Sequence, residues 1–268
     1  MGNLGMGFTT IEFECDSAVA VLTLNRPDRL NSFNSTMHAE VREAFVEVES
    51  NADIRCLLMT GRGRGFCAGQ DLGDRKVNAD GSPPDLEASI RDNYNPLIKR
   101  ITELPKPVVC AVNGIAAGAG ANIALAADIV IAARSAVFIQ AFCKIGLIPD
   151  SGGTWQLVNL LGRARAMGLA MTGDRLDAEQ AQQWGLIWKC VDDDALEAES
   201  LTMARHFAGQ PTVGLGLTKQ AINAAVVNDL ENQLDLEARL QGIAGRSEDY
   251  KEGVDAFLGK RQPRFKGR

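Results

Sequence analysis

The sequence has few of the residues that support metal, redox or disulfide chemistry. It contains two histidines and six widely spaced cysteines without a Cys-x-x-Cys pair, which predicts neither a zinc site nor a disulfide framework. Basic residues are in the minority, at 28 Lys and Arg against 34 Asp and Glu, so charge gives no general reason to bind nucleic acid. We expect reduced core thiols, a cytoplasmic protein, and no metal or redox cofactor.

Long hydrophobic runs are also missing. Asp128 and Arg134 interrupt the best candidates, and the N-terminus lacks the basic-then-apolar order of a secretory signal. We therefore expect neither a membrane span nor an export signal. The 268 residues are 46% hydrophobic and 23% charged, which is ordinary for a globular chain long enough to bury a large core.

The order of apolar patterns predicts an α/β fold followed by helices. Strands are expected at residues 18–24, 55–60, 107–112 and 129–132, and a helix at 35–49 with Met37, Val41, Phe45 and Val48 on one face. Residues 73–85 predict a surface loop, a candidate lid. Beyond Asp193 the pattern predicts only helices, at 195–209, 214–228, 230–244 and 249–257. We expect a core of residues 1–192 and a helical oligomerisation region of residues 193–268.

Three glycine-rich segments are candidates for chemistry. Residues 65–72 (GFCAGQDL) and 113–122 (NGIAAGAGAN) could each expose a backbone N–H that stabilises an oxyanion. Residues 145–155 (IGLIPDSGGTW) place Asp150 in an apolar turn, where a carboxyl group is a candidate acid/base. Each segment has a structural alternative: a tight strand-to-helix turn, a closely packed helix of small residues, and a helix cap at Asp150. The local sequence leaves these alternatives open.

Taken together, these segments resemble the crotonase (enoyl-CoA hydratase/isomerase) superfamily. The resemblance runs through NRPDRLNS (25–32), GFCAGQDL (65–72), AVNGIAAGAG (111–120), AADIVIAA (126–133), GLIPDSGGTW (146–155) and AFLGKR (256–261). The similarity is greatest to the superfamily's isomerases of phenylacetate degradation. It implies a ββα spiral core, a helical C-terminal trimerisation region and an acyl-CoA thioester as ligand.

The resemblance assigns roles to residues on both sides of the thioester. It places the two backbone donors of an oxyanion hole at Gln70 and Ala119, where alanine is acceptable if its φ is negative. Hydratases of the superfamily carry two glutamates at positions that hold Asn122 and Phe142 here. Since neither side chain is a general base at neutral pH, Asp150 remains as the catalytic acid/base, which favours isomerisation over water addition.

Further residues are assigned to binding. Those expected at CoA and the thioester, with the last two acting from a neighbouring subunit, are Arg29, Leu30, Ala68, Asp71, Leu72, Phe257 and Lys260. Those expected to wall an acyl pocket are Asn122, Phe138, Phe142 and Trp155. Packing aromatics and a solvated lysine are the structural alternatives. His38 and His206 match no catalytic position and are expected to face solvent or stabilise their helices.

The expected activity is therefore an acyl-CoA isomerase. The resemblance implies conversion of ring-1,2-epoxyphenylacetyl-CoA to 2-oxepin-2(3H)-ylideneacetyl-CoA, with 3,4-to-2,3-enoyl-CoA isomerisation by the same single-aspartate shuttle. The alternatives are an enoyl-CoA hydratase and a CoA-binding scaffold of a catabolic complex. An RNA-binding role is disfavoured because the first predicted helix is acidic. Expected partners are the thioester, copies of the chain in a homotrimer or hexamer, and a companion enoyl-CoA hydratase, without nucleic acid or membrane.

Overall fold

The computed structural model describes residues 2–3, 7–74 and 84–268. Residues 75–83 of the predicted loop lie outside this range. The strands expected from the sequence are present as β3 (Val19–Leu24), β4 (Cys56–Gly61), β6 (Val108–Val112) and β8 (Ile129–Ala133). Their side chains are mostly buried, as expected for parallel strands covered on both faces.

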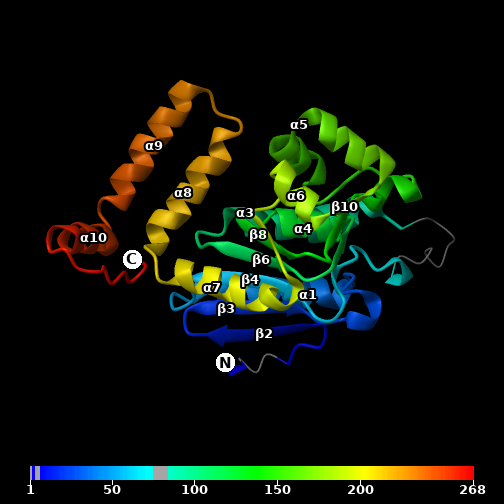
Figure 1. Ribbon diagram of the computed structural model, residues 1–268, viewed down its shortest axis with the longest axis horizontal. Helices are drawn as coiled ribbons and strands as arrows, with labels where there is room; N and C mark the ends of the chain where they lie inside the picture. Colours follow the sequence, from blue (N-terminus) through cyan, green and yellow to red (C-terminus); the bar gives the residue numbers. More distant parts are fainter. Residues whose placement is uncertain (1, 4–6, 75–83) are drawn as a thin grey trace.

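A large sheet combines these strands in the order β1-β2-β3-β4-β6-β8-β11. The three remaining strands are β1 (Gly2–Asn3), β2 (Ile11–Asp16) and β11 (Lys189–Val191). Strands β1, β2 and β3 pair antiparallel, whereas β3 to β11 run parallel to one another. Figure 1 shows β2, β3, β4, β6 and β8 stacked in this order.

A smaller sheet has the order β10-β9-β7-β5. It contains β5 (Gly65–Cys67), β7 (Ile115–Ala117), β9 (Val137–Ile139) and β10 (Arg175–Asp177). Successive strands alternate between the sheets, since β4, β6 and β8 lie in the large one and β5, β7 and β9 in the small one. Helical segments follow each such pair of strands, which confirms the ββα spiral.

The helices of the spiral lie at the turns between strand pairs. Helix α1 (Ser35–Ser50) begins at Asn34, whose side chain accepts a hydrogen bond from Met37 N at 2.9 Å, and it buries the predicted apolar face. The others are η1 (Pro27–Arg29), η2 (Leu72–Asp74), α2 (Leu86–Ser89), η3 (Ile90–Tyr94), α3 (Asn95–Glu103), α4 (Ala119–Leu125), η4 (Ala141–Ile145), α5 (Gly153–Thr172) and α6 (Ala178–Trp184). Among the described residues, none of the helices is both long and apolar enough to cross a membrane.

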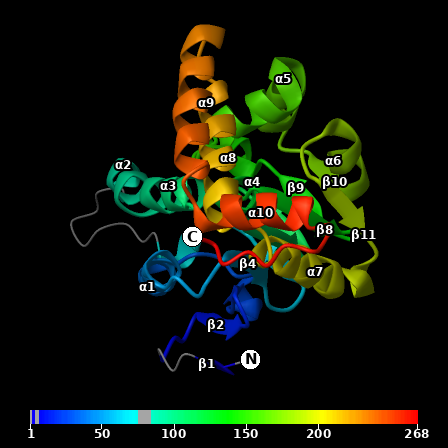
Figure 2. The same ribbon diagram turned by 90° about the vertical axis from the view of Figure 1, so that its left-hand side faces the viewer.

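The C-terminal segment is helical, as predicted. It consists of η5 (Asp193–Ala195), α7 (Leu196–Ala208), α8 (Thr212–Ala225), α9 (Leu230–Ala244) and α10 (Glu248–Leu258). Helix α7 packs against β3, β4, β6 and β8, so it forms part of the cover of the large sheet. Helices α8 and α9 instead extend away from the sheets as a pair, with α10 beside them (Figures 1 and 2). The expected boundary at residue 193 remains a prediction.

Candidate active site

The loop after β3 is tied to the small sheet by one buried asparagine. Asn31 has a φ of 55°, a conformation that asparagine tolerates better than most residues. Its Oδ1 accepts a hydrogen bond from Arg26 N at 2.8 Å, and its Nδ2 donates to Gly65 O at 2.8 Å and to Arg62 O at 3.0 Å. These hydrogen bonds therefore attach the NRPDRLNS segment to the start of β5.

The same loop forms backbone hydrogen bonds that fix the conformation of residues 68–71. Ala68 N donates to Leu30 O at 2.9 Å, which joins a residue predicted at the thioester to one predicted at the CoA nucleotide. Phe33 N donates to Gly69 O at 2.7 Å and Phe33 O accepts from Asp71 N at 2.8 Å. Since Phe33 bonds to both neighbours of Gln70 in a parallel bridge, the Gln70 N–H is directed away from Phe33. This orientation leaves it available to a ligand.

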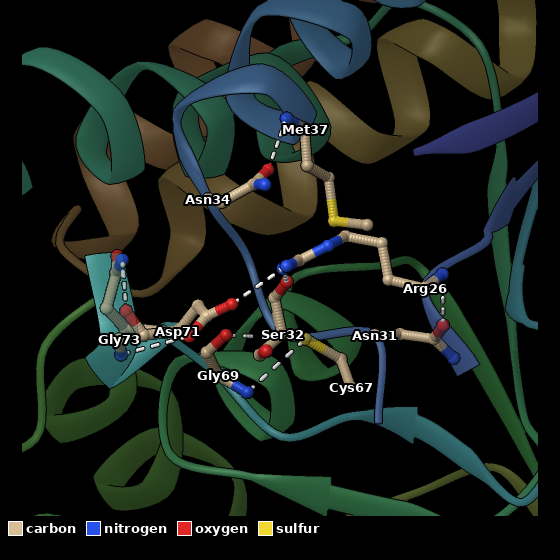
Figure 3. Close-up of polar contacts among 10 residues, drawn as sticks. Arg26, Asn31, Ser32, Asn34, Met37, Cys67, Gly69, Asp71 and Gly73 are labelled. Carbon is tan, nitrogen blue, oxygen red and sulfur yellow. Dashed lines mark hydrogen bonds and ion pairs between the residues drawn. The ribbon is translucent and has the colours of Figure 1, made fainter. Parts of the chain in front are cut away.

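An ion pair braces this loop (Figure 3). Arg26 Nη2 lies 2.8 Å from Asp71 Oδ2, and the other oxygen of Asp71 accepts from Gly73 N at 3.0 Å. The Arg26 hydrogen bond lowers the pKa of Asp71 below its usual value, against the opposing effect of desolvation. Asp71 thus holds the turn, while Arg29 and Leu72 are exposed beside it.

We expect Asp71→Asn to destabilise the fold by about 1–2 kcal/mol at neutral pH, because a charged hydrogen bond is lost. A folded-state pKa below the unfolded value of about 3.9 makes this contribution fully present above pH 5. It is lost as the pH falls through the folded-state pKa. Denaturant titrations of both proteins at several pH values measure the difference. A difference that grows toward acid would contradict the assignment.

The second predicted oxyanion donor, Ala119, lies at the start of α4. Gly118 precedes the helix with a φ of 53°, and its N–H donates to Ile139 O at 2.8 Å. Ala119 is the first helical residue and is not among the residues of positive φ, so alanine fits there without strain. First-turn amides have no acceptor within their own helix, which suits them to bind a developing negative charge.

Glycines bring the two predicted donors together. A Cβ built on Gly69 would lie 2.9 Å from Ala117 O and 3.3 Å from Ala119 N. A Cβ built on Gly120 would lie 2.7 Å from the Cys67 carbonyl carbon. The loop that carries Gln70 and the start of α4 are therefore in direct backbone contact. This contact requires glycine at both positions.

Asp150 occupies a tight turn before α5. Its carbonyl oxygen accepts from Gly153 N at 2.9 Å, and Ser151 Oγ donates to its Oδ1 at 2.8 Å. The N-cap of α5 is Gly152, without a side-chain cap, so the helix-cap alternative for the Asp150 carboxylate is wrong. Asp150 is partly exposed. Asn122 Nδ2 donates to Asp150 O at 2.8 Å and so attaches this turn to α4.

The predicted acyl wall is assembled only in part. The Phe142 ring lies against Gly118, because a Cβ built there would be 3.7 Å from its Cζ. Phe138 is buried in β9, opposite Ala116 of β7. Trp155 is 47% exposed in a groove with Leu125 and Ile222, because it lies on the side of α5 that faces α8. The structure therefore does not bring Trp155 to Phe142.

Phe257 and Lys260 lie apart from the site within the chain. Phe257 is 83% exposed near the end of α10, and Lys260 follows it with a φ of 50°. Figure 1 shows α10 at the opposite end of the molecule from α5. Their proposed contact with CoA therefore requires a neighbouring copy, and that contact remains a prediction.

Two residues that pack beside the loop of Gln70, Tyr94 and His38, were not predicted there from the sequence. Tyr94 is fully buried, and its hydroxyl donates to Gln70 Oε1 at 2.9 Å. His38 is only 8% exposed and its ring lies 4.6 Å from that of Tyr94, so the first of its two expected roles, facing solvent, is wrong, and stabilising its helix remains a prediction. His206 is exposed near the end of α7. No local pattern predicts the Tyr94–Gln70 contact, since 24 residues separate its partners.

Comparison with known proteins identifies relatives over almost the whole chain. The family model described as enoyl-CoA hydratase/isomerase matches residues 14–268. The 1,2-epoxyphenylacetyl-CoA isomerase of Escherichia coli K12 is 61% identical over 94% of this chain and 97% of its own length. A probable enoyl-CoA hydratase of Rhodobacter capsulatus is 48% identical over 98% of this chain and 100% of its own. An enoyl-CoA hydratase/isomerase structure from Cupriavidus metallidurans CH34 superposes with a TM-score of 0.91 at 32% identity, covering 98% of each chain.

Proposed function

Because the chain belongs to the enoyl-CoA hydratase/isomerase family, we propose that it is an acyl-CoA isomerase. Its proposed reaction converts ring-1,2-epoxyphenylacetyl-CoA to 2-oxepin-2(3H)-ylideneacetyl-CoA. The observation that carries this proposal is that, of the three positions where the family carries catalytic acids, all of them among the described residues, only that of Asp150 holds a carboxylate. Asp150 lies in a turn bonded to the helix of the second oxyanion donor, while Asn122 and Phe142 supply no further acid. The high identity to the Escherichia coli isomerase supports the same substrate.

The proposed mechanism is a proton transfer through an enolate. The epoxide equilibrates with its seven-membered oxepin form by redistribution of its own bonds. Asp150 then removes a proton from the carbon next to the thioester, and the N–H groups of Gln70 and Ala119 hold the oxygen that becomes negative. Asp150 returns the proton to a ring carbon, which leaves an exocyclic double bond conjugated with the thioester. No atom is gained or lost, so one acid/base is sufficient.

The same steps would move an isolated double bond into conjugation. We expect 3-hexenoyl-CoA to be converted to its 2,3-isomer, followed by absorbance, and the epoxide thioester to give the oxepin product. Crotonyl-CoA should not be converted to 3-hydroxybutyryl-CoA, since water addition would need a second acid/base. Rapid hydration with no double-bond migration would show the chain to be a hydratase. CoA binding with neither reaction would support the scaffold alternative.

We further propose that the active form is a homotrimer or a pair of trimers. Helices α8 to α10 and the turns between them expose a group of apolar side chains, a feature typical of subunit contacts. The group comprises Ile222, Val226, Val227, Leu230, Leu234, Val254, Phe257 and Leu258. Sedimentation should give the mass of three or six chains, with activity only in the assembled form. A stable, active monomer would rule this out.

Proton transfer requires neither a metal nor a redox cofactor, and we propose that the enzyme uses none beyond the CoA of its substrate. Activity should therefore persist unchanged after dialysis against EDTA. Loss of activity that zinc or magnesium restores would overturn this expectation.

The six free thiols support a cytoplasmic location. A companion enoyl-CoA hydratase, which would act on a conjugated product, is a proposed partner that co-purification can test.

A further inference from the structure

Asn122 is the most completely enclosed polar side chain near the proposed base. It is fully buried in α4, and both ends of its amide are hydrogen bonded. Nδ2 donates to Asp150 O at 2.8 Å, and Oδ1 accepts from Gln140 Nε2 at 2.8 Å. The side chain therefore connects three segments of the spiral: α4, the residue before η4, and the turn before α5.

A neutral amide satisfies both contacts at this position. The Asp150 carbonyl needs a donor, while the Gln140 amide group needs an acceptor. A carboxylate of the same shape would place an oxygen against the Asp150 carbonyl and leave a buried charge. Gly153 permits the close approach, because a Cβ built there would lie 2.7 Å from Asn122 Cγ.

Asn122 also lies in the first turn of the helix that carries the second oxyanion donor. Its own N–H bonds to Gly118 O at 3.3 Å, and Ala119 is the first residue of that turn. One rigid turn of helix thus carries the Ala119 N–H at its start and, through the Asn122 side chain, the Asp150 peptide. The backbone around Asp150 needs such support, since Ser151 has a φ of 51°.

We propose that Asn122 is a positioning residue that sets the place of Asp150 relative to the oxyanion hole. This inference rests on the proposed proton shuttle of Asp150. Asn122 does not contact the reacting atoms. It acts through the Asp150 peptide, and its loss allows the turn to move away from α4. Displacement of a catalytic group by about 1 Å can lower the rate about 10²-fold, so the effect should be large.

The test compares Asn122→Asp, Asn122→Ala and Gly153→Ala in the full-length protein with 3-hexenoyl-CoA as substrate. We expect kcat to fall about 10²-fold in the two Asn122 variants while KM stays within about threefold, because the CoA contacts are elsewhere. Gly153→Ala keeps both functional side chains and forces them apart, so it should also lower kcat. The control is Asn223→Asp, which makes the same chemical change in an exposed asparagine whose Nδ2 donates to Thr102 O at 2.9 Å. It should retain wild-type kcat.

Each Asn122 variant is also combined with Asp150→Asn. If Asn122 acts through Asp150, it should have no further effect on kcat once the base is gone. Equal loss in both backgrounds, or loss of CoA binding, would mean a general structural role and overturn the inference. Wild-type kcat in folded Asn122 variants, with Asp150→Asn inactive, would overturn this inference alone. Full activity of Asp150→Asn itself would instead reject the proposed function.

Discussion

Replacing Asp150 by asparagine is expected to lower kcat for double-bond migration by about 10²–10⁴-fold, the usual contribution of a general acid/base. The asparagine side chain keeps an oxygen that can accept a hydrogen bond from the Ser151 hydroxyl, which donates to Asp150 Oδ1 at 2.8 Å. The turn should therefore stay intact, and KM should change little. Steady-state kinetics with 3-hexenoyl-CoA measure the loss. Exchange of the proton next to the thioester with deuterated solvent should disappear in parallel.

The matched control is Asp194→Asn, which removes an exposed carboxylate from η5. It should leave kcat, KM and thermal stability at wild-type values. Similar activities for the two variants would be incompatible with a proton shuttle at Asp150. A stable Asp150→Asn protein that has lost migration but still exchanges the proton with solvent would place the base elsewhere.

Gly120→Ala is the second change with a large expected effect. Its Cβ would lie 2.7 Å from the carbonyl carbon and 2.8 Å from Cβ of Cys67, in a fully buried place where the backbone must shift. Overpacking of this kind costs about 1–3 kcal/mol of stability. The start of α4 would move away from the loop of Gln70, and the two proposed oxyanion donors would no longer converge. Losing one such donor lowers kcat about 10²–10³-fold.

Gly168→Ala provides the comparison for that experiment. Gly168 lies inside α5, where an added Cβ meets nothing within 4 Å. The change should be neutral or stabilise the fold by about 0.4–1 kcal/mol, because alanine restricts the unfolded chain. Urea unfolding gives the stabilities, and kcat gives the catalytic effect. Normal kcat in Gly120→Ala would mean that the contact between α4 and Cys67 does not align the donors.

Periodicity in the sequence was sufficient for part of the fold: four strands of the large sheet, helix α1 and the C-terminal helices, but not the small sheet. The face of Met37, Val41, Phe45 and Val48 is buried in α1, and four predicted strands lie in the large sheet. The close packing that the sequence left open as an alternative for the glycine-rich segments is present, since Gly69 and Gly120 permit backbone contacts that any side chain would block. These features depend on local geometry and the size of one residue. Residues that are close in the sequence therefore determine these features.

The partners of individual side chains depended on the tertiary structure. Asn122 and Trp155 were both predicted to wall an acyl pocket, yet Asn122 bonds to the Asp150 turn and Trp155 faces α8. Tyr94 had no predicted role, and it bonds to Gln70. A hydrophobic pattern shows that one side of a helix is buried, but it carries no information about the segment packed against it. That segment is set by how the turns of the spiral stack, which brings residues 24 or 28 positions apart into contact.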